Sequence, residues 1–416
     1  MFERTPREQE WASWLWVVLW SGVIFALVPM ARALEAVVVG SLGRIAFLYA
    51  VFASLALAAG LAVRHLRRGG RMPASQALAL ALVVTCYAGY VWHLRGSPVE
   101  ALHFVEYGVL GLLAFRALSH RIQDPSVYVG AALIGGGVGI VDEAIQWATP
   151  DRVWDLRDMG FNFVGAGAIQ VGIAAGLRPA RISHPVTAAS VRTVCAIAAV
   201  CVVLLAISLL NTPERISAYS GRLPGLAFLA ERPDVMIEYG YLYDDPEIGR
   251  FRSRFGPSEL GPLDAARGES AGRILAAFTG DAEAFLVRYT TIRDPFLHEV
   301  RVHLFRRDRY LENAASRREG SNKWQSLLTV AHRENRILEK YFPVTLRHSQ
   351  ASLGAAERRR LETQQNGDEA YESRVSEGLR TGFRERHVLA GAAGLLLALW
   401  GIARGADRAF AGSEER

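Results

Sequence analysis

A charged stretch between two apolar stretches decides how this chain folds. "VDEAIQWATPDRVWDLRDMGFNFVGAGAIQ", residues 141–170, connects the runs 127–147 and 160–177, each apolar enough to cross a membrane. The stretch carries acidic residues and arginines: Asp142, Glu143, Asp151, Asp155, Asp158, Arg152 and Arg157. Because a charged side chain facing lipid costs about 2.5–3.5 kcal/mol even on insertion scales, we expect these side chains to turn toward one another or toward a polar cavity.

Apolar runs along the 416 residues indicate a membrane protein. Each run has the roughly 17–25 residues that a membrane-spanning helix requires. They occupy residues 11–30, 45–63, 76–94, 101–119, 127–147, 160–177, 189–210 and 387–403. Residues 211–386 contain no such run and are rich in charge. We therefore predict a polytopic α-helical membrane protein of about eight transmembrane helices, with an α+β or mostly helical soluble domain inserted before the last one.

The same pattern divides the chain into five segments. These are 1–74 with the first two helices, 75–178 with a four-helix membrane domain, 179–210 with the seventh helix, 211–386 as the soluble domain, and 387–416 with the last helix and a short tail. Cys86, Cys195 and Cys201 all lie in apolar runs. We therefore predict neither a disulfide framework nor a thiolate metal site.

The distribution of arginines predicts the orientation in the membrane. The connector "RHLRRGGR", residues 64–71, is the most basic loop, and basic loops stay in the cytoplasm. Counting spans from it places both termini inside, and places the loops 31–44, 95–100 and 148–158 outside together with residues 211–386. We expect an integral protein of the inner (cytoplasmic) membrane whose residues 211–386 are extracytoplasmic. Because the arginines gather at helix ends, the basic net charge reflects topology, and no nucleic-acid partner is expected.

This orientation brings polar side chains of three spans to one region of the outer leaflet. An α-helix turns about 100° per residue, so polar residues three or four apart share one face. The fourth, fifth and sixth spans each carry such a stripe near the outer end, and arginines of the connecting loop can hold carboxylates through paired hydrogen bonds. The predicted pocket consists of Glu100, His103, Tyr107, Asp142, Glu143, Gln146, Arg152, Asp155, Asp158 and Asn162.

Three uses of this pocket fit its residue types, and a purely structural role is the alternative to them. It can bind the head group of an amphiphile whose tail lies in the bilayer. It can perform acid–base chemistry, with Glu143 as the base and His103 as the acid or as an orienting group. It can bind a divalent cation through carboxylates and one imidazole, although we predict no metal and no cofactor. Finally, the side chains can pair only to hold three helices together, with Asp155 or Asp158 as a helix N-cap.

The spacing of these residues resembles the VanZ-like membrane family. The pattern is Glu143-x2-Gln146-x3-Pro150-x-Arg152-x2-Asp155-x2-Asp158-x3-Asn162-x2-Gly165, preceded by His103-Phe104-x2-Tyr107-x2-Leu110-Gly111. The resemblance covers about residues 75–178. It places the family's motif positions on His103, Tyr107, Glu143, Gln146, Arg152, Asp155, Asp158 and Asn162. Two positions depart from the pattern: Glu100 stands where aspartate is common, and Asp151 replaces the glycine that usually precedes the arginine.

The resemblance implies an envelope-linked role at the outer leaflet. Such families are associated with reduced susceptibility to glycopeptide antibiotics such as teicoplanin, without an established biochemical activity. The expected partners are therefore membrane lipids and an amphiphilic or glycopeptide ligand. A binding function is favoured over an enzymatic one. Two alternatives stay open: an intramembrane enzyme that acts on a lipid or lipid-linked substrate through Glu143 and His103, and a sensor that acts through residues 211–386 and a protein partner of unknown identity.

Periodicity predicts the elements of the soluble domain. Residues 234–243 and 298–313 have β-rich runs, and the second run resembles a hairpin that turns near 306–308. Residues 324–342 have the apolar spacing of an amphipathic helix that a proline ends. A polar helix is expected around 350–366.

Three other groups of residues have structural interpretations. His298 and His303 would lie on opposite faces of a strand, so no metal site with Glu299 is predicted. The glycine pairs inside apolar runs indicate close helix packing rather than a phosphate loop: Gly135 with Gly139, and Gly172 with Gly176. The tandem arginines are expected on solvated faces, with contact to an anionic polymer or to lipid head groups as the alternative: Arg306, Arg307, Arg309 and Arg358–Arg360.

Overall fold

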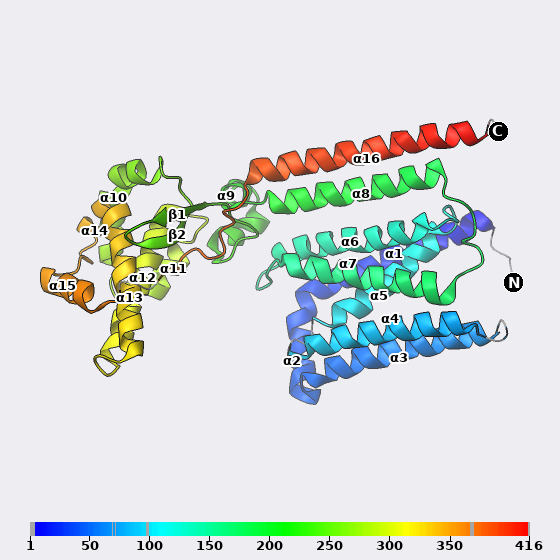
Figure 1. Ribbon diagram of the computed structural model, residues 1–416, viewed down its shortest axis with the longest axis horizontal. Coiled ribbons are helices and arrows are strands. Elements are labelled where there is room, and N and C mark those ends of the chain that lie inside the picture. The colour runs from blue at the N-terminus through cyan, green and yellow to red at the C-terminus, as the bar shows by residue number, and fades with distance from the viewer. Residues whose placement is uncertain (1–4, 69, 71, 97–99, 367–369, 415–416) are drawn as a thin grey trace. The chain divides into compact units, whose positions relative to one another are not determined.

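The computed structural model is mostly helical, with 73% of residues in helices and one small two-stranded sheet (Figure 1). It describes residues 5–68, 70, 72–96, 100–366 and 370–414. The chain forms two compact units: unit 1 is Met1–Ser208 with Leu389–Arg416, and unit 2 is Leu209–Val388. Parts of the predicted loops 64–71 and 95–100 lie outside the described residues.

Unit 1 is built from long apolar helices. Its elements are α1 (Pro6–Leu27), η1 (Val28–Met30), α2 (Ala31–Leu42), α3 (Ile45–Arg68), α4 (Ala74–His93), η2 (Leu94–Gly96), α5 (Leu102–Leu118), α6 (Ser126–Trp147), α7 (Leu156–Val171), the π-helical turn η3 (Gly172–Leu177), α8 (Ala188–Leu209) and α16 (Glu385–Glu414). Within the described residues, 7 helical segments are long and apolar enough to cross a membrane. The remaining predicted span is α5, whose 17 residues are at the lower limit for crossing a bilayer. Each predicted apolar run therefore forms a helix.

The predicted loop 31–44 is wrong over most of its length, because Ala31–Leu42 form α2. Alanine, leucine, arginine and glutamate fill the first turns of this segment, and all four are strong helix formers. The helix ends at Gly43, whose φ of 77° is a backbone conformation that glycine adopts without strain. A short 3-10 turn at Val28–Met30 separates α2 from α1, so the first apolar run continues well past its predicted end.

Helix α5 lies between α1, α6 and α7 in unit 1. Its Tyr107 and Leu110 are fully buried in a cluster with Val17 of α1 and Ala166 of α7. Between membrane-spanning helices such contacts stabilise the bundle through van der Waals packing, since lipid tails are as apolar as these side chains. The indole Nε1 of Trp20 in α1 also donates a hydrogen bond to the carbonyl of Glu106, at 2.9 Å. Helix α1 therefore belongs to the same bundle as the three helices that carry the predicted pocket.

Two glycines allow α6 and α7 to approach closely. A Cβ at Gly135 would lie 2.3 Å from the Cβ of Ala166, and a Cβ at Gly139 would lie 2.7 Å from the Cβ of Asn162. Non-bonded carbon atoms do not approach to these distances, so any larger residue would separate the helices. The packing prediction for this pair is confirmed, and the close approach sets Asn162 directly against α6.

Unit 2 is a mostly helical module with one β-hairpin. Its elements are α9 (Pro213–Ser220), η4 (Pro224–Glu231), β1 (Tyr241–Asp245), β2 (Gly249–Ser253), α10 (Leu260–Ala277), α11 (Ala282–Arg288), α12 (Pro295–Ala315), α13 (Asn322–Tyr341), α14 (Pro343–His348) and α15 (Ala355–Gln364). The two strands pair antiparallel, with Tyr241 opposite Ser253. Phe251 of the hairpin packs with Phe296 of α12 and Leu338 of α13 in the main core. Of the two predicted forms of this domain, the mostly helical one is therefore correct.

The predicted hairpin at 298–313 is wrong, because these residues lie within α12. The side chain of Asp294 caps the helix by accepting a hydrogen bond from the backbone nitrogen of Leu297 at 3.1 Å, and Pro295 occupies the first helical position. The buried apolar residues follow helical spacing: Phe296, Leu297, Val300 and Leu304. Two valines at alternate positions produced the false strand signal.

Two predicted helices of unit 2 are confirmed, and one predicted strand is partly correct. The amphipathic helix expected at 324–342 is α13, and Pro343 begins the next helix, α14. The polar helix expected around 350–366 is α15. The β-rich run 234–243 is correct only at its end, where β1 begins at Tyr241.

Glu334 of α13 is a buried junction for three segments of unit 2. One carboxylate oxygen lies 2.6 Å from Nδ1 of His303 on α12. The other accepts hydrogen bonds from the hydroxyls of Tyr371 at 2.6 Å and Ser373 at 2.7 Å. Burial alone would raise the pKa of Glu334, but His303, Tyr371 and Ser373 together hold it below its usual value. The segment after α15 is therefore fixed to α12 and α13 by one carboxylate.

His298, Glu299 and His303 are directed to three different partners. His298 Nδ1 lies 3.4 Å from the hydroxyl of Thr291, and Glu299 Oε2 accepts a hydrogen bond from the backbone of Arg254 at 3.0 Å. Because α12 is a helix, the expected placement of the two histidines on opposite faces of a strand is also wrong.

Candidate functional site

The polar residues of α6 lie on one buried face near the end of that helix. Asp142, Glu143 and Gln146 are each less than 5% exposed, and their spacing places them within one turn. The amide nitrogen of Gln146 donates to Oε1 of Glu143 at 2.8 Å. Its oxygen accepts a hydrogen bond from Nη2 of Arg152 at 2.6 Å. Gln146 thus connects a carboxylate of α6 to an arginine of the loop that follows.

The turn from α6 to α7 completes the shell around Glu143. The backbone nitrogen of Asp155 donates to Oε2 of Glu143 at 2.9 Å, so both carboxylate oxygens of Glu143 are hydrogen-bonded. Asp155 also caps α7, since its side chain accepts a hydrogen bond from the backbone nitrogen of Arg157 at 2.8 Å. The N-cap role predicted for Asp155 is therefore confirmed.

Helix α5 contributes His103, Tyr107 and one residue that was not predicted, Glu106. His103 Nδ1 lies 3.7 Å from Oε2 of Glu106, and the rings of His103 and Tyr107 have centroids 6.3 Å apart. The carboxyl group of Glu106 is also close enough to that of Asp142 on α6 for the two like charges to repel each other. The signal was available, because Glu106 follows His103 by three residues and therefore shares its side of the helix.

Several polar atoms of this cluster have no hydrogen-bond partner among the residues that the structure describes. They are Nδ1 of His103, Oδ1 of Asp158, and both amide atoms of Asn162. The hydroxyl of Tyr107 lies within hydrogen-bonding reach of the carboxylate of Asp142. Asn162 and Tyr107 are fully buried. Buried polar atoms in folded proteins nearly always have partners, so this concentration at one end of three helices is unusual.

The structure places Glu100 away from the centre of the predicted pocket and, in the part of the chain that it describes, it does not join the expected pair of His103 and Glu143. Glu100 pairs with Arg157 at 3.1 Å, but this arginine is 61% exposed, so the pair lies at the rim of the cluster. Within the described residues, no hydrogen bond or ion pair joins His103 to Glu143. Arg152 is the charge common to the cluster, because it interacts electrostatically with His103, Glu106, Asp142 and Asp158.

We use the name polar cluster for the residues on α5, α6, α7 and the α6–α7 turn that meet here: His103, Glu106, Tyr107, Asp142, Glu143, Gln146, Arg152, Asp155, Asp158 and Asn162. The polar cluster contains more carboxylates than arginines, since Arg152 is its one arginine. Its polar atoms without a hydrogen-bond partner among the described residues include both donors and acceptors. This arrangement can hold a group that offers several hydrogen bonds, or exchange protons with one. Within the described residues, no three histidine, cysteine or acidic side chains are grouped so as to hold a metal ion.

Comparison with known proteins gives no match: no family model, curated protein or solved structure corresponds to this chain.

Proposed function

We propose that this chain is a VanZ-like integral membrane protein whose polar cluster binds the head group of an amphiphilic envelope ligand. The observation that carries the proposal is the set of buried, unpartnered polar atoms in the described part of the cluster. Each such atom costs about 1–3 kcal/mol unless something hydrogen-bonds to it. Because the set contains donors and acceptors, it favours a head group with hydroxyl or amide groups, as sugars and peptides have.

The backbone at Asp151 supports the resemblance to the VanZ-like family. Asp151 has a φ of 60°, in the left-handed region where glycine is free of strain and aspartate is tolerated better than most residues. This is the position at which the family usually has glycine. The departure in the sequence therefore occurs where the α6–α7 turn accepts either residue, and the shape of the turn does not depend on it.

In the proposed topology the chain crosses the inner (cytoplasmic) membrane eight times, with α5 as the fourth span. Both termini then lie in the cytoplasm. The support for this topology is the grouping of arginines at the ends of helices opposite to the polar cluster. They include Arg64, Arg67 and Arg68 of α3, Arg116 of α5, Arg121, Arg178, Arg181, Arg192 of α8 and Arg404 of α16. In this topology the polar cluster faces the outer leaflet and residues 211–386 are extracytoplasmic.

The enzymatic alternative with Glu143 as the base has less support. Both oxygens of Glu143 are hydrogen-bonded to neighbours, which makes this residue a positioning group for the α6–α7 turn. An acid–base pair would more naturally be His103 with Glu106, which lie 3.7 Å apart. A product formed from a lipid would reveal such chemistry.

Asn162→Ala tests the binding proposal. Neither amide atom of Asn162 has a partner among the described residues, so the substitution removes no internal hydrogen bond. We expect thermal stability in detergent to be retained or to rise. In nanodiscs, we expect affinity for teicoplanin to fall about tenfold, the effect of roughly 1.4 kcal/mol of lost hydrogen bonding. Cells that express the variant should tolerate teicoplanin no better than cells without the protein.

The matched control is Asp151→Asn, an isosteric change of an exposed residue beside the cluster. It should leave binding and tolerance as they are in the parent protein. Equal tolerance in the parent and in a folded Asn162→Ala protein would refute the proposal. A new lipid product that depends on the parent protein and disappears in His103→Gln would instead establish the enzymatic alternative.

A further inference from the structure

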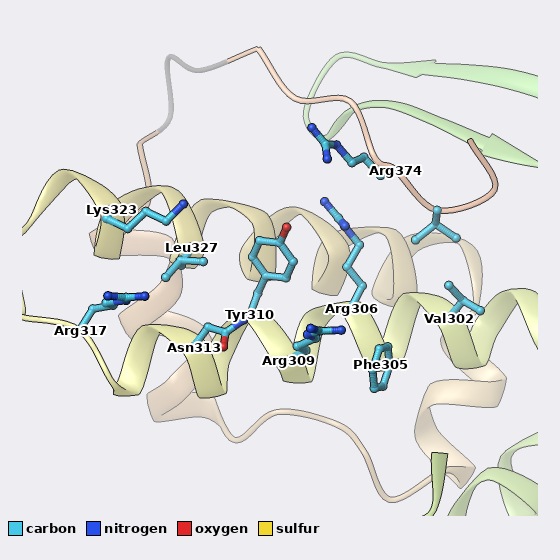
Figure 2. A pocket seen from close by; sticks show the side chains of 11 residues that line it. Val302, Phe305, Arg306, Arg309, Tyr310, Asn313, Arg317, Lys323, Leu327 and Arg374 are labelled. Carbon is cyan, nitrogen blue, oxygen red and sulfur yellow. The ribbon is translucent and has the colours of Figure 1, made fainter. Parts of the chain in front are cut away.

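A second cavity lies entirely within unit 2 and is unrelated to the polar cluster. It has a volume of about 550 Å³, within the range of small-molecule sites. Helices α12 and α13 form its floor and one side, and the segment that carries Arg374 crosses above it (Figure 2). Glu334 accepts a hydrogen bond from Ser373 of that segment at 2.7 Å, so this wall of the cavity is held to α13.

The lining of this cavity is strongly cationic. It includes Arg306, Arg309, Arg317, Lys323 and Arg374, and no acidic side chain among the described lining residues. Of these five, only Arg306 forms an ion pair with a described residue. Gathering like charges around one cavity is unfavourable unless an anion compensates them. The charges come from α12, the α12–α13 turn, α13 and the 370–384 segment, so folding has brought them together.

Two of these guanidinium groups are positioned to face one another. Arg306 is held from behind by Glu334, with Nε 2.9 Å from the carboxylate, and its guanidinium lies 4.7 Å from the ring centroid of Tyr310. Figure 2 shows Arg306 and Arg374 pointing toward each other across the cavity, with the hydroxyl of Tyr310 beside them. Guanidinium groups in this arrangement match the oxygens of a phosphate, which accept paired hydrogen bonds.

We infer that this cavity binds a phosphate ester that carries at least two negative charges. The cationic residues bind the phosphate, and the side chains of Phe305, Tyr310 and Leu327, which also line the cavity, contact the organic part of the ligand. Phosphate fits better than carboxylate because it offers more acceptor oxygens to several cationic groups at once. This site is independent of the polar cluster and of the function proposed for it.

The test uses the full chain in phosphatidylcholine nanodiscs, titrated calorimetrically with glycerol 3-phosphate and with inorganic pyrophosphate. We expect both probes to bind, and binding to weaken as ionic strength rises. Arg374→Gln and Lys323→Gln should each raise the dissociation constant about tenfold, because each removes one charge-assisted hydrogen bond. Neither residue has an ion pair with a described residue, so neither change removes an internal one.

Arg359→Gln is the matched control, because Arg359 is exposed on α15 and does not line the cavity. Its dissociation constants should equal those of the parent protein. The inference is overturned by the absence of binding for both probes, or by an equal loss of affinity in Arg359→Gln. It is also overturned if added phosphatidylglycerol vesicles bind through Arg374 and Lys323 while neither soluble phosphate does, because the cluster would then contact a membrane surface.

Discussion

The carboxylates of the polar cluster differ in how their oxygens are used. Glu143 is fully buried and both its oxygens accept hydrogen bonds. Asp158 keeps one oxygen without a partner among the described residues. A carboxylate whose oxygens are already bonded fixes a neighbouring backbone, whereas one with an open oxygen can meet a ligand. Glu143 therefore positions the turn that carries Arg152, and in the proposed function the unpartnered atoms near Asn162 meet the ligand.

In unit 2, His298 supplies a pH-dependent part of the stability. Burial, together with the nearby charge of Arg254, lowers the pKa of His298 from 6.5 to about 4. Between these values the unfolded chain binds a proton that the folded chain excludes, so stability falls as the pH decreases from 6.5 toward 4. At about pH 5 this difference is on the order of 2 kcal/mol.

His298→Gln should remove this dependence, because glutamine does not titrate. The measurement is pulse proteolysis of unit 2 in urea, in the full-length protein, at about pH 7 and about pH 5. We expect the parent to lose about 2 kcal/mol more than the variant between the two conditions. Comparison within each protein removes the direct effect of the substitution. Parallel losses in both proteins would show that His298 does not titrate differently on folding.

Residue patterns in the sequence identified part of this cluster and missed the rest for a physical reason. Polar residues in apolar runs are visible because their burial is costly, and this located Asp142, Glu143 and Asn162. The partners of each side chain depend on the path of the α6–α7 turn, which sequence spacing does not specify. Glu106 shares the side of α5 that carries His103, but a stripe through Glu100, His103 and Tyr107 does not include it, and the packing of α1 against α5 helps to determine which side of this helix is enclosed.

Among the elements, apolar length proved a better guide than alternation. Long apolar runs form helices because a helix satisfies all its backbone hydrogen bonds internally. The short run at 298–313 misled because Val300 and Val302 alternate, whereas the N-cap at Asp294 and the four apolar residues on one helical face outweigh this local preference. The hairpin that the structure contains, β1–β2, is short. The β-rich run 234–243 reached only the start of β1, and no pattern predicted β2.

Glu334 shows how one residue can join elements that are far apart in the sequence. Glu334→Gln removes a buried charge that lies within reach of His303 and accepts hydrogen bonds from Tyr371 and Ser373. We expect unit 2 to lose about 2–5 kcal/mol, the usual effect of breaking a buried, hydrogen-bonded pair. Pulse proteolysis of the full-length protein measures this loss. Hydrogen exchange should also speed up at 371–375, where the side chains of Tyr371 and Ser373 are held to α13.

Glu312→Gln makes the same chemical change at an exposed position on α12 that has no ion pair with a described residue. It should change stability by less than about 0.5 kcal/mol. If Glu334→Gln were equally mild, the carboxylate would not be what holds the 370–384 segment.

For the whole molecule, the order of the helices determines which ends face the same side. Arg192 near the start of α8 pairs with Asp407 near the end of α16, so these two helices run antiparallel. The chain therefore leaves unit 1 after α8 and returns to it before α16 at one common end. If α5 crosses the membrane, the start of α5, the α6–α7 turn and these two connections all lie on the side opposite the basic end of α3.

Single cysteines in a background without Cys86, Cys195 and Cys201 test this topology in intact cells. Val153→Cys in the α6–α7 turn and Glu312→Cys in unit 2 should react with a membrane-impermeant maleimide, because both are expected outside and both positions are exposed. His65→Cys, at the basic end of α3, should react only after permeabilisation, because the positive-inside rule places it in the cytoplasm. Labelling of all three after lysis controls for accessibility. Protection of both Val153→Cys and Glu312→Cys in intact cells, with His65→Cys also protected, would mean that α5 does not cross, which would leave seven spans and move the α6–α7 turn and unit 2 to the cytoplasmic side.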